Sequence, residues 1–334
     1  MKIAIDARIT YNSDALLRRF TIAFWEDVAI SQAGQEFIII GRWKKTSGMP
    51  ANVEIHLLKK GVFKWLEQQK LNRLLDSWKA DRLVTLQETG FSVQRLRQGA
   101  IQTSPAVENK QVLFTGSLQN KAADAGKSII ALQPALPEIM TDPSWAETES
   151  IKTQYTGGRS FFLFTGNIEA QQHLVELLKA FSVFKKWQQS NMQLVIAGSS
   201  NKWTEILEEK LLTYKYKADV VLVKNPVDKE TARLVAASYA LLYPAAGNVF
   251  PLAMLWAVQG HKAVIATSSP QNRQITGAAV WVEPADTTDG FAKAMIQLYK
   301  DENQLQLLVQ QTKEQSKQFN RQQMIADAWQ CIEQ

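Results

Sequence analysis

Cysteine is almost absent from this chain of 334 residues, in which Cys331 is the only one. A single cysteine excludes an internal disulfide and a cysteine-rich metal site, and it favours a reducing, cytoplasmic location. The three histidines, His56, His173 and His261, are scattered and do not form a metal-binding pattern. The sequence therefore predicts neither a metal ion nor a tightly held cofactor.

Long apolar runs and common catalytic motifs are also missing. No run of about 18 to 20 apolar residues occurs, so we expect no membrane-spanning helix. The chain opens directly on a strand-like run, Met1-Lys-Ile-Ala-Ile-Asp6, which leaves no room for a signal peptide. The P-loop, zinc-protease, serine-hydrolase and dithiol motifs are absent. The net charge of +6 comes from dispersed Lys and Arg, so no nucleic acid partner is expected.

Short apolar runs alternate with longer amphipathic stretches along the whole chain, a rhythm typical of parallel sheets with crossover helices. The α/β class follows from it. The predicted strands are residues 3–5, 37–40, 83–86, 112–114, 129–132, 161–165, 194–197, 220–223, 240–243, 263–266 and 279–282.

Two domains are expected from the chain length and from one break in this rhythm. Residues 134–143 contain three prolines, and Gly157-Gly158 precedes a new strand. We therefore divide the chain into an N-terminal domain of residues 1–145 and a C-terminal domain of residues 146–334. The last stretch, about 303–332, is polar with a helical apolar pattern.

The stretch from Leu242 to Thr267 reads LYPAAGNVFPLAMLWAVQGHKAVIAT. It resembles the donor-binding signature of retaining, family 4-like glycosyltransferases of GT-B fold, and the resemblance extends over about residues 161–332. It implies two Rossmann-like domains facing a cleft and a C-terminal helix that crosses back to the first domain. It also implies a UDP- or GDP-sugar as donor substrate and a glycan or lipid as acceptor.

Several residues that bind the donor in this family are replaced here. The two glutamates of the signature correspond to Asn248 and Trp256, and the basic residues that clasp the diphosphate correspond to the neutral segment 167–173. By resemblance, the donor-cleft candidates are Gly166, Asn167, Gln171, Gln172, His173, Gly198, Gly247, Asn248, Val249, Phe250 and Trp256.

Each of these polar candidates also has a purely structural interpretation. The segment 167–173 also fits a polar loop that begins a helix, and His173 fits a surface residue. Trp256 lies among apolar residues at helical spacing, which favours a core position over stacking on a base or sugar. Asn248 fits an ordinary turn residue as well as a retained polar contact.

The N-terminal domain departs from the family pattern as well. The loop after the first strand, residues 9–18, has no glycine, although a glycine there lets the backbone approach the donor phosphate. Arg8 and Asn12 are acceptor-side candidates on this loop. Ser104, in the strand-like segment 100–105, is a third candidate because it corresponds to the family's His-Asp pair.

Residues 56–76 form a basic amphipathic segment with Trp65 and Leu66 among lysines. Such helices bind anionic membrane surfaces, which would place the protein peripherally at the inner face of the membrane. The alternative is a helix that buries its apolar stripe on the sheet.

Two functions fit the sequence. One is a glycosyltransferase with an altered donor site. The other is a non-catalytic GT-B scaffold that binds a glycan, a nucleotide or a protein partner.

Overall fold

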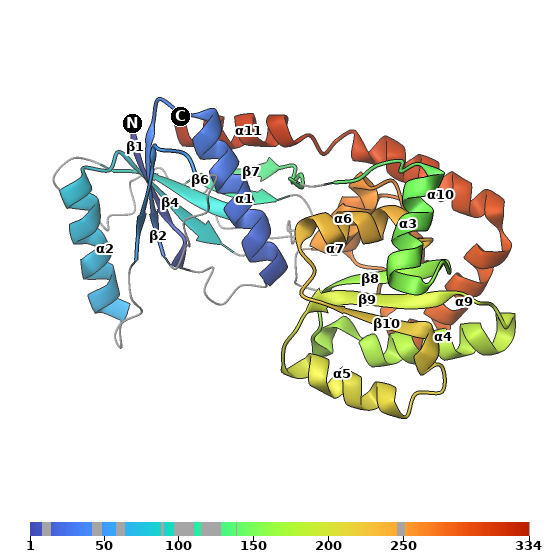
Figure 1. The fold of residues 1–334 in the computed structure, drawn as a ribbon. Coiled ribbons are helices and arrows are strands. Elements are labelled where there is room, and N and C mark those ends of the chain that lie inside the picture. The colour runs from blue at the N-terminus through green and yellow to red at the C-terminus, as the bar shows by residue number, and fades with distance from the viewer. Residues whose placement is uncertain are drawn as a thin grey trace. The chain divides into compact units, whose positions relative to one another are not determined.

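The computed structural model describes residues 1–8, 15–41, 49–57, 64–87, 90–96, 110–114, 128–137, 139–245 and 251–333. The chain forms two compact units, one of Met1–Pro134 with Asn320–Gln334 and the other of Ala135–Phe319. Each unit is a β-sheet with helices against it (Figure 1). The predicted α/β class and the two Rossmann-like sheets are thereby confirmed.

The first unit has a seven-stranded sheet of order β3-β2-β1-β4-β5-β6-β7. Its strands pair in parallel except for β5, which is antiparallel to both β4 and β6. The elements are β1 (Lys2–Asp6), α1 (Ala15–Ser31), β2 (Glu36–Ile40), β3 (Val53–His56), α2 (Lys64–Trp78), β4 (Arg82–Gln87), β5 (Gly90–Arg95), β6 (Lys110–Phe114), β7 (Ser128–Leu132) and α11 (Arg321–Glu333).

Helices bury apolar side chains on the sheet of the first unit. From α1, Phe24 and Trp25 are buried, and the Trp25 ring meets the edge of Phe91 on β5 at 5.1 Å between centroids. From α2, Leu71 and Leu75 pack into a cluster with residues of β1, β2 and β4. The aromatic pair of Trp25 and Phe91 adds about 1 kcal/mol beyond the area that it buries.

The second unit has a six-stranded sheet of order β10-β9-β8-β11-β12-β13, in which every pair is parallel. Its elements are α3 (Trp145–Thr156), β8 (Phe161–Asn167), η2 (Ala170–Gln172), α4 (Leu174–Gln188), β9 (Gln193–Ser199), α5 (Lys202–Leu212), η3 (Lys217–Asp219), β10 (Val220–Lys224), α6 (Asp228–Ala237), β11 (Ala240–Tyr243), α7 (Leu252–Gln259), β12 (Ala263–Thr267), α8 (Pro270–Thr276), β13 (Val280–Val282), η4 (Pro284–Asp286), α9 (Thr287–Lys300) and α10 (Glu302–Ser316).

The sheet of the second unit is covered on both faces, with α3 and α6 on one side and α4 and α5 on the other (Figure 1). Both faces of β8 are therefore apolar, and Phe161 to Phe164 are all fully buried. Phe162 and Phe164 point into the cluster that also holds the α4 stripe of Leu177, Phe181 and Phe184. The spacing of these residues, close to 3.6 per turn, forms the apolar stripe of α4.

The unit boundaries differ from those drawn from the sequence. The first unit ends at Pro134, whereas the sequence placed the boundary at residue 145. The intervening segment leads into α3, which begins with a capping box between Ser144 and Glu147 and packs against α6. It therefore belongs to the second unit.

The C-terminal stretch is also divided differently, because it forms two helices in different units. Helix α10 stays in the second unit, whereas α11 contacts α1, β6 and β7 of the first. Met324, Ala328 and Ile332 of α11 are buried there. The return of the C-terminal helix to the first unit, which the family resemblance implied, is present.

Candidate functional site

The strand order of the second unit defines a switch point between β8 and β11. From this pair the chain runs outward to β9 and β10 on one side and to β12 and β13 on the other. In open parallel sheets, ligands bind outside the carboxyl ends of the two strands at such a point. The pairing of β8 with β11 stops at Leu163 and Leu241, so the last residues of β8 extend beyond it. The loops after β8 and β11 therefore form the candidate site.

Strand β8 ends with Gly166 and Asn167, and the φ of Gly166, 145°, lies in the region that favours glycine. Asn167 follows and is 8% exposed, and its Nδ2 donates to Oε1 of Glu169 at 3.2 Å. The Asn167 Oδ1 is buried and accepts no hydrogen bond from the described residues. This side chain is held inside the loop by its carboxylate neighbour.

The short helix η2 carries the next two candidates, Gln171 and Gln172. Gln172 is 5% exposed, and its buried Oε1 also accepts no hydrogen bond in the described part of the chain. The side chain of Gln171 lies outside that part. The structure thus places the Gln172 amide in the protein interior, where it is shielded from solvent.

His173 links η2 to α4 and adopts a φ of 50°. Its side chain is about half exposed, and its Nδ1 lies 4.0 Å from Oε2 of Glu176. The segment from Gly166 to His173 contains Glu169 and neither Arg nor Lys. The wall of the candidate site after β8 consequently lacks a permanent cation of its own.

Gly198, on β9, is the register partner of Gly166. A Cβ atom at Gly198 would overlap the carbonyl oxygen of Gly166 and approach the Ile168 side chain to 2.9 Å. Glycine is therefore required here by the close approach of two strands. This packing role explains Gly198 without any ligand.

The loop after β11 contains the candidates Gly247, Asn248, Val249 and Phe250, which all lie outside the described residues. The residues just before them are anchored. Thr267 Oγ1 donates to Pro244 O at 2.7 Å, and Asn272 Nδ2 donates to Ala245 O at 3.1 Å. Sequence reasoning missed Thr267 and Asn272. The only sequence feature near them was the helix start at Ser269-Pro270, in which Ser269 lies three residues before Asn272.

Trp256 lies on α7, a helix whose eight residues are all buried. The indole is 2% exposed, and its Nε1 has no hydrogen-bond partner among the described residues. Helix α7 contacts β8 and β11. Trp256 is therefore a core residue, and its ring has no surface available for stacking on a ligand.

Of the acceptor-side candidates in the first unit, only Arg8 is described. Arg8 follows β1 and forms a bidentate pair with Asp6, at 2.8 and 2.7 Å, and it also approaches Glu67 of α2 at 3.8 Å. Two carboxylates thus compensate its charge. Asn12 and Ser104 lie outside the described residues.

The basic segment 56–76 is described for residues 56–57 and 64–76. Leu71 and Leu75 are buried on the sheet, as in the sheet-packing alternative, while Trp65 is 60% exposed. Lys70 and Arg73 are also exposed. Over the described ranges, no helix has the length and apolarity needed to cross a membrane. In the same ranges no three His, Cys, Asp or Glu residues gather in a metal-binding group.

Comparison with known proteins identifies the family. The model of the family "Glycosyl transferases group 1" matches residues 146–315. The chain belongs to this family, and a role in glycosyl transfer is supported. The search of curated proteins found no match.

Solved structures of GT-B glycosyltransferases share the fold over nearly the whole chain. WaaG, a glycosyltransferase involved in lipopolysaccharide biosynthesis, is 13% identical with a TM-score of 0.73, and the match covers 99% of both chains. Sucrose-phosphate synthase from Thermosynechococcus elongatus is 13% identical with a TM-score of 0.74, covering 99% of this chain and 98% of that one. HepE from Anabaena, in complex with UDP and glucose, is 9% identical with a TM-score of 0.71, covering 100% and 99%.

Proposed function

We propose that this chain is a family 4-like glycosyltransferase scaffold with a substituted donor site, which does not transfer sugar efficiently from ordinary UDP- or GDP-sugars. One observation carries the proposal. The segment Gly166–His173 at the switch point provides neutral amides where related enzymes place basic residues, and the Gln172 amide is buried.

The charge of the leaving group explains why this substitution matters. A departing nucleoside diphosphate gains negative charge in the transition state and needs fixed cationic donors nearby. Losing one such donor commonly costs about 3 kcal/mol of transition-state stabilisation. With Glu169 as the charged group of this segment, the local field opposes a diphosphate.

Trp256 supports the same conclusion from the other side of the switch point. By resemblance it replaces a carboxylate that accepts hydrogen bonds from sugar or ribose hydroxyls. An indole has a single N–H donor and no acceptor, so it cannot make those bonds. Its burial also removes the ring from contact with a ligand.

A non-catalytic scaffold is the second candidate, and the burial of both Gln172 and Trp256 favours it. Such a protein would use the same sheet edge, or another face, to bind a glycan, a nucleotide or a protein partner. The solved complex of HepE with UDP-glucose has the same fold. Because both candidates can bind a nucleotide weakly, sugar transfer to an acceptor is the property that separates them.

We also propose a cytoplasmic protein that contacts the inner face of a membrane through residues 56–76. The exposed Trp65 with Lys70 and Arg73 on the same helix supports this contact, because an aromatic ring and cations together favour an anionic lipid surface.

Isothermal titration with a panel of UDP- and GDP-sugars tests the donor site. We expect no saturable binding below millimolar concentration, since a millimolar dissociation constant corresponds to only about 4 kcal/mol. Micromolar binding of one donor together with sugar transfer to an acceptor would refute the proposal. In that case Lys202, the first residue of α5 after β9, is the first cation to replace, by Lys202→Gln.

A further inference from the structure

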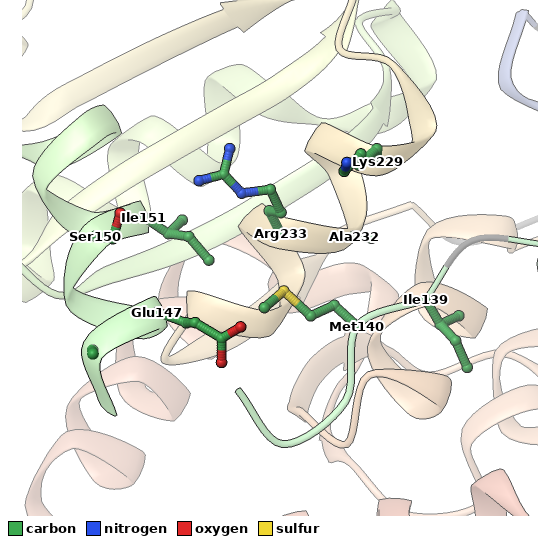
Figure 2. Close-up of a pocket in the computed structure, with 9 residues that line it drawn as sticks. Ile139, Met140, Glu147, Ser150, Ile151, Lys229, Ala232 and Arg233 are labelled. Carbon is green, nitrogen blue, oxygen red and sulfur yellow. The ribbon is translucent and has the colours of Figure 1, made fainter. Parts of the chain in front are cut away.

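A pocket of about 560 Å³ opens on the second unit between α3, α6 and the segment before α3. Figure 2 shows side chains from all three segments converging on it. The volume falls within the range of about 300–1,000 Å³ that is typical of small-molecule sites. None of the residues that line it belongs to the loops after β8 and β11. The lining residues are Ile139, Met140, Ala146, Glu147, Ser150, Ile151, Lys229, Ala232 and Arg233.

The floor and one wall of the pocket are apolar. Ile151 and Ala232 are buried beneath it, at 1% and 5% exposure. Ile139 keeps 44% of its surface exposed at the rim. Trp145, next to Ala146 in sequence, is 79% exposed. Apolar side chains left in water beside a concave surface indicate a ligand with an apolar part.

Two cations come from α6 on the opposite side. Lys229 and Arg233 are four residues apart and therefore lie on the same face of the helix. Neither is paired with a carboxylate in the described part of the chain, whereas most other charged residues of this unit have ion pairs or hydrogen bonds. The acid of the same turn, Glu230, is bound to the Tyr155 hydroxyl and to the N–H of Val227.

Glu147 is the one carboxylate among the described residues that line the pocket. Its Oε2 accepts from the backbone N–H and the hydroxyl of Ser144, at 2.8 and 2.7 Å, and these bonds lower the pKa of Glu147 below its usual value. It therefore stays ionised at neutral pH. Together with Lys229 and Arg233 it leaves one net positive charge among the described residues that line the pocket.

We propose that this pocket binds an amphiphilic monoanion, namely an acyl chain that carries a single acidic head group. Lys229 and Arg233 hold the head group by charge-assisted hydrogen bonds. The chain lies along Ile139 and Met140, which removes their apolar surface from water. The site is separate from the proposed donor site, and its test does not depend on sugar transfer.

The arrangement of charge favours a monoanion over a nucleoside diphosphate. Glu147 repels a group with several negative charges, and the apolar wall offers no donor for a ribose or a base. A neutral lipid would gain no charge-assisted hydrogen bond from the two cations of α6. A single negative charge on an acyl chain is therefore the feature that distinguishes the proposed ligand from a nucleoside diphosphate and from a neutral lipid.

Isothermal titration of the full chain with dodecanoate, at concentrations below micelle formation, tests the proposal. Dodecanol and dodecyltrimethylammonium serve as neutral and cationic probes of equal chain length. We expect saturable binding of dodecanoate, at least ten-fold weaker binding of dodecanol, and none of the cation. Sedimentation with vesicles of phosphatidylglycerol, compared between the natural protein and Arg233→Gln, distinguishes a membrane lipid from a free acid as the source of the ligand, because membrane contact through residues 56–76 is the same in both.

Three variants locate the binding. Arg233→Gln removes one cation and should weaken dodecanoate at least ten-fold, while dodecanol is unaffected. Ser150→Phe fills the pocket from an exposed helix position and should abolish binding of both probes. Lys210→Gln, at an exposed position on α5, is the matched control and should change nothing.

Circular dichroism and thermal unfolding verify that each variant is folded. The proposal is overturned if folded Ser150→Phe binds dodecanoate as well as the natural protein does. It is equally overturned if dodecanoate and dodecanol bind alike, or if neither binds.

Discussion

The side-chain amide of Gln259 accepts a hydrogen bond from the N–H of Leu136 at 2.8 Å and is buried at 4% exposure. Its Nε2 donates in the other direction, to the carbonyl oxygen of Phe319 at 3.2 Å. Leu136 and Phe319 stand at the two ends of the second unit, where the chain enters and leaves it. The side-chain amide of Gln259 on α7 thus binds the backbone at both ends of the second unit.

Replacing this amide should destabilise the second unit. Gln259→Leu keeps the size of the side chain but leaves a buried N–H and a buried C=O without partners, at a cost of about 3 kcal/mol. Urea unfolding measured by circular dichroism gives the change in unfolding free energy. Gln306→Leu, at an exposed position of α10, should stay within about 0.5 kcal/mol. Equal stability of the two variants would contradict the role of Gln259.

Asp142 should make stability depend on pH in the acid range. Hydrogen bonds from Lys313 at 2.8 Å and with His261 at 3.2 Å lower the pKa of Asp142 below its usual value. Since the folded-state pKa is depressed, the stabilisation is present above the unfolded value of about 3.9 and is lost as pH falls through the folded value.

The variant Asp142→Asn should therefore reduce the pH dependence of stability below about pH 4. Because Asp142 is mostly exposed, solvent screening keeps the effect small. Urea midpoints measured from pH 3 to about pH 6 test this expectation. Glu209→Gln, an exposed position on α5, is the control and should preserve the natural slope.

Tyr214 should lose its stabilising effect in alkaline solution. Its hydroxyl donates to Leu178 O at 2.7 Å and accepts from Ser182, and burial raises the pKa of Tyr214 to about 12. Because the folded-state pKa is raised, the contribution is complete below the unfolded value of about 10 and is lost as pH rises through about 12.

At neutral pH, Tyr214→Phe should cost about 1 kcal/mol, since the hydrogen bond from the hydroxyl to Leu178 O is lost while Ser182 Oγ still donates to that oxygen. Ultraviolet titration of phenolate should show that the variant lacks one late-titrating group. Tyr299→Phe, at an exposed ring, should leave stability nearly unchanged. If Tyr214→Phe left both stability and the late titration unaltered, the assigned contacts would be wrong.

Donor-site restoration should succeed at one position and fail at two others. Gln171→Arg adds a cation beside the switch point and should improve binding of UDP-glucose in isothermal titration. Gln172→Lys and Trp256→Glu would place charges at positions only 5% and 2% exposed, so both should destabilise the fold by several kcal/mol. Gln171→Glu is the charge-reversed control. Equal binding by the Arg and Glu variants would show that charge at this position is irrelevant.

Local periodicity alone predicted most of the sheets. Each of the eleven strands predicted from the alternating rhythm coincides with a strand in the structure, because apolar runs of three to five residues bounded by polar segments have few other folded forms. The strands β3 and β5 were missed. In β3, Val53 is buried while Glu54 is exposed, and β5 (GFSVQR) alternates too, so neither shows the continuous apolar run of a buried parallel strand.

The family also followed from the sequence, because the 242–267 pattern is a local feature. The burial of the candidate side chains inside the fold could not be predicted from the sequence. The sequence of α7 shows an apolar helix, but only packing against β8 and β11 buries Trp256 from all sides. Similarly, the amide of Gln172 is turned inward by the short helix η2, which propensity does not predict.

The sequence by itself determined the α/β class, most elements and the neutral donor segment, since these depend on residue order and short-range spacing. Tertiary structure decided which sheet receives α11, how Gln259 joins residues 136 and 319, and that residues 139–151 and 229–233 share a pocket. These relationships join segments far apart in the chain. They arise because each apolar face buries itself against whichever surface the fold brings near, and local sequence does not encode that choice.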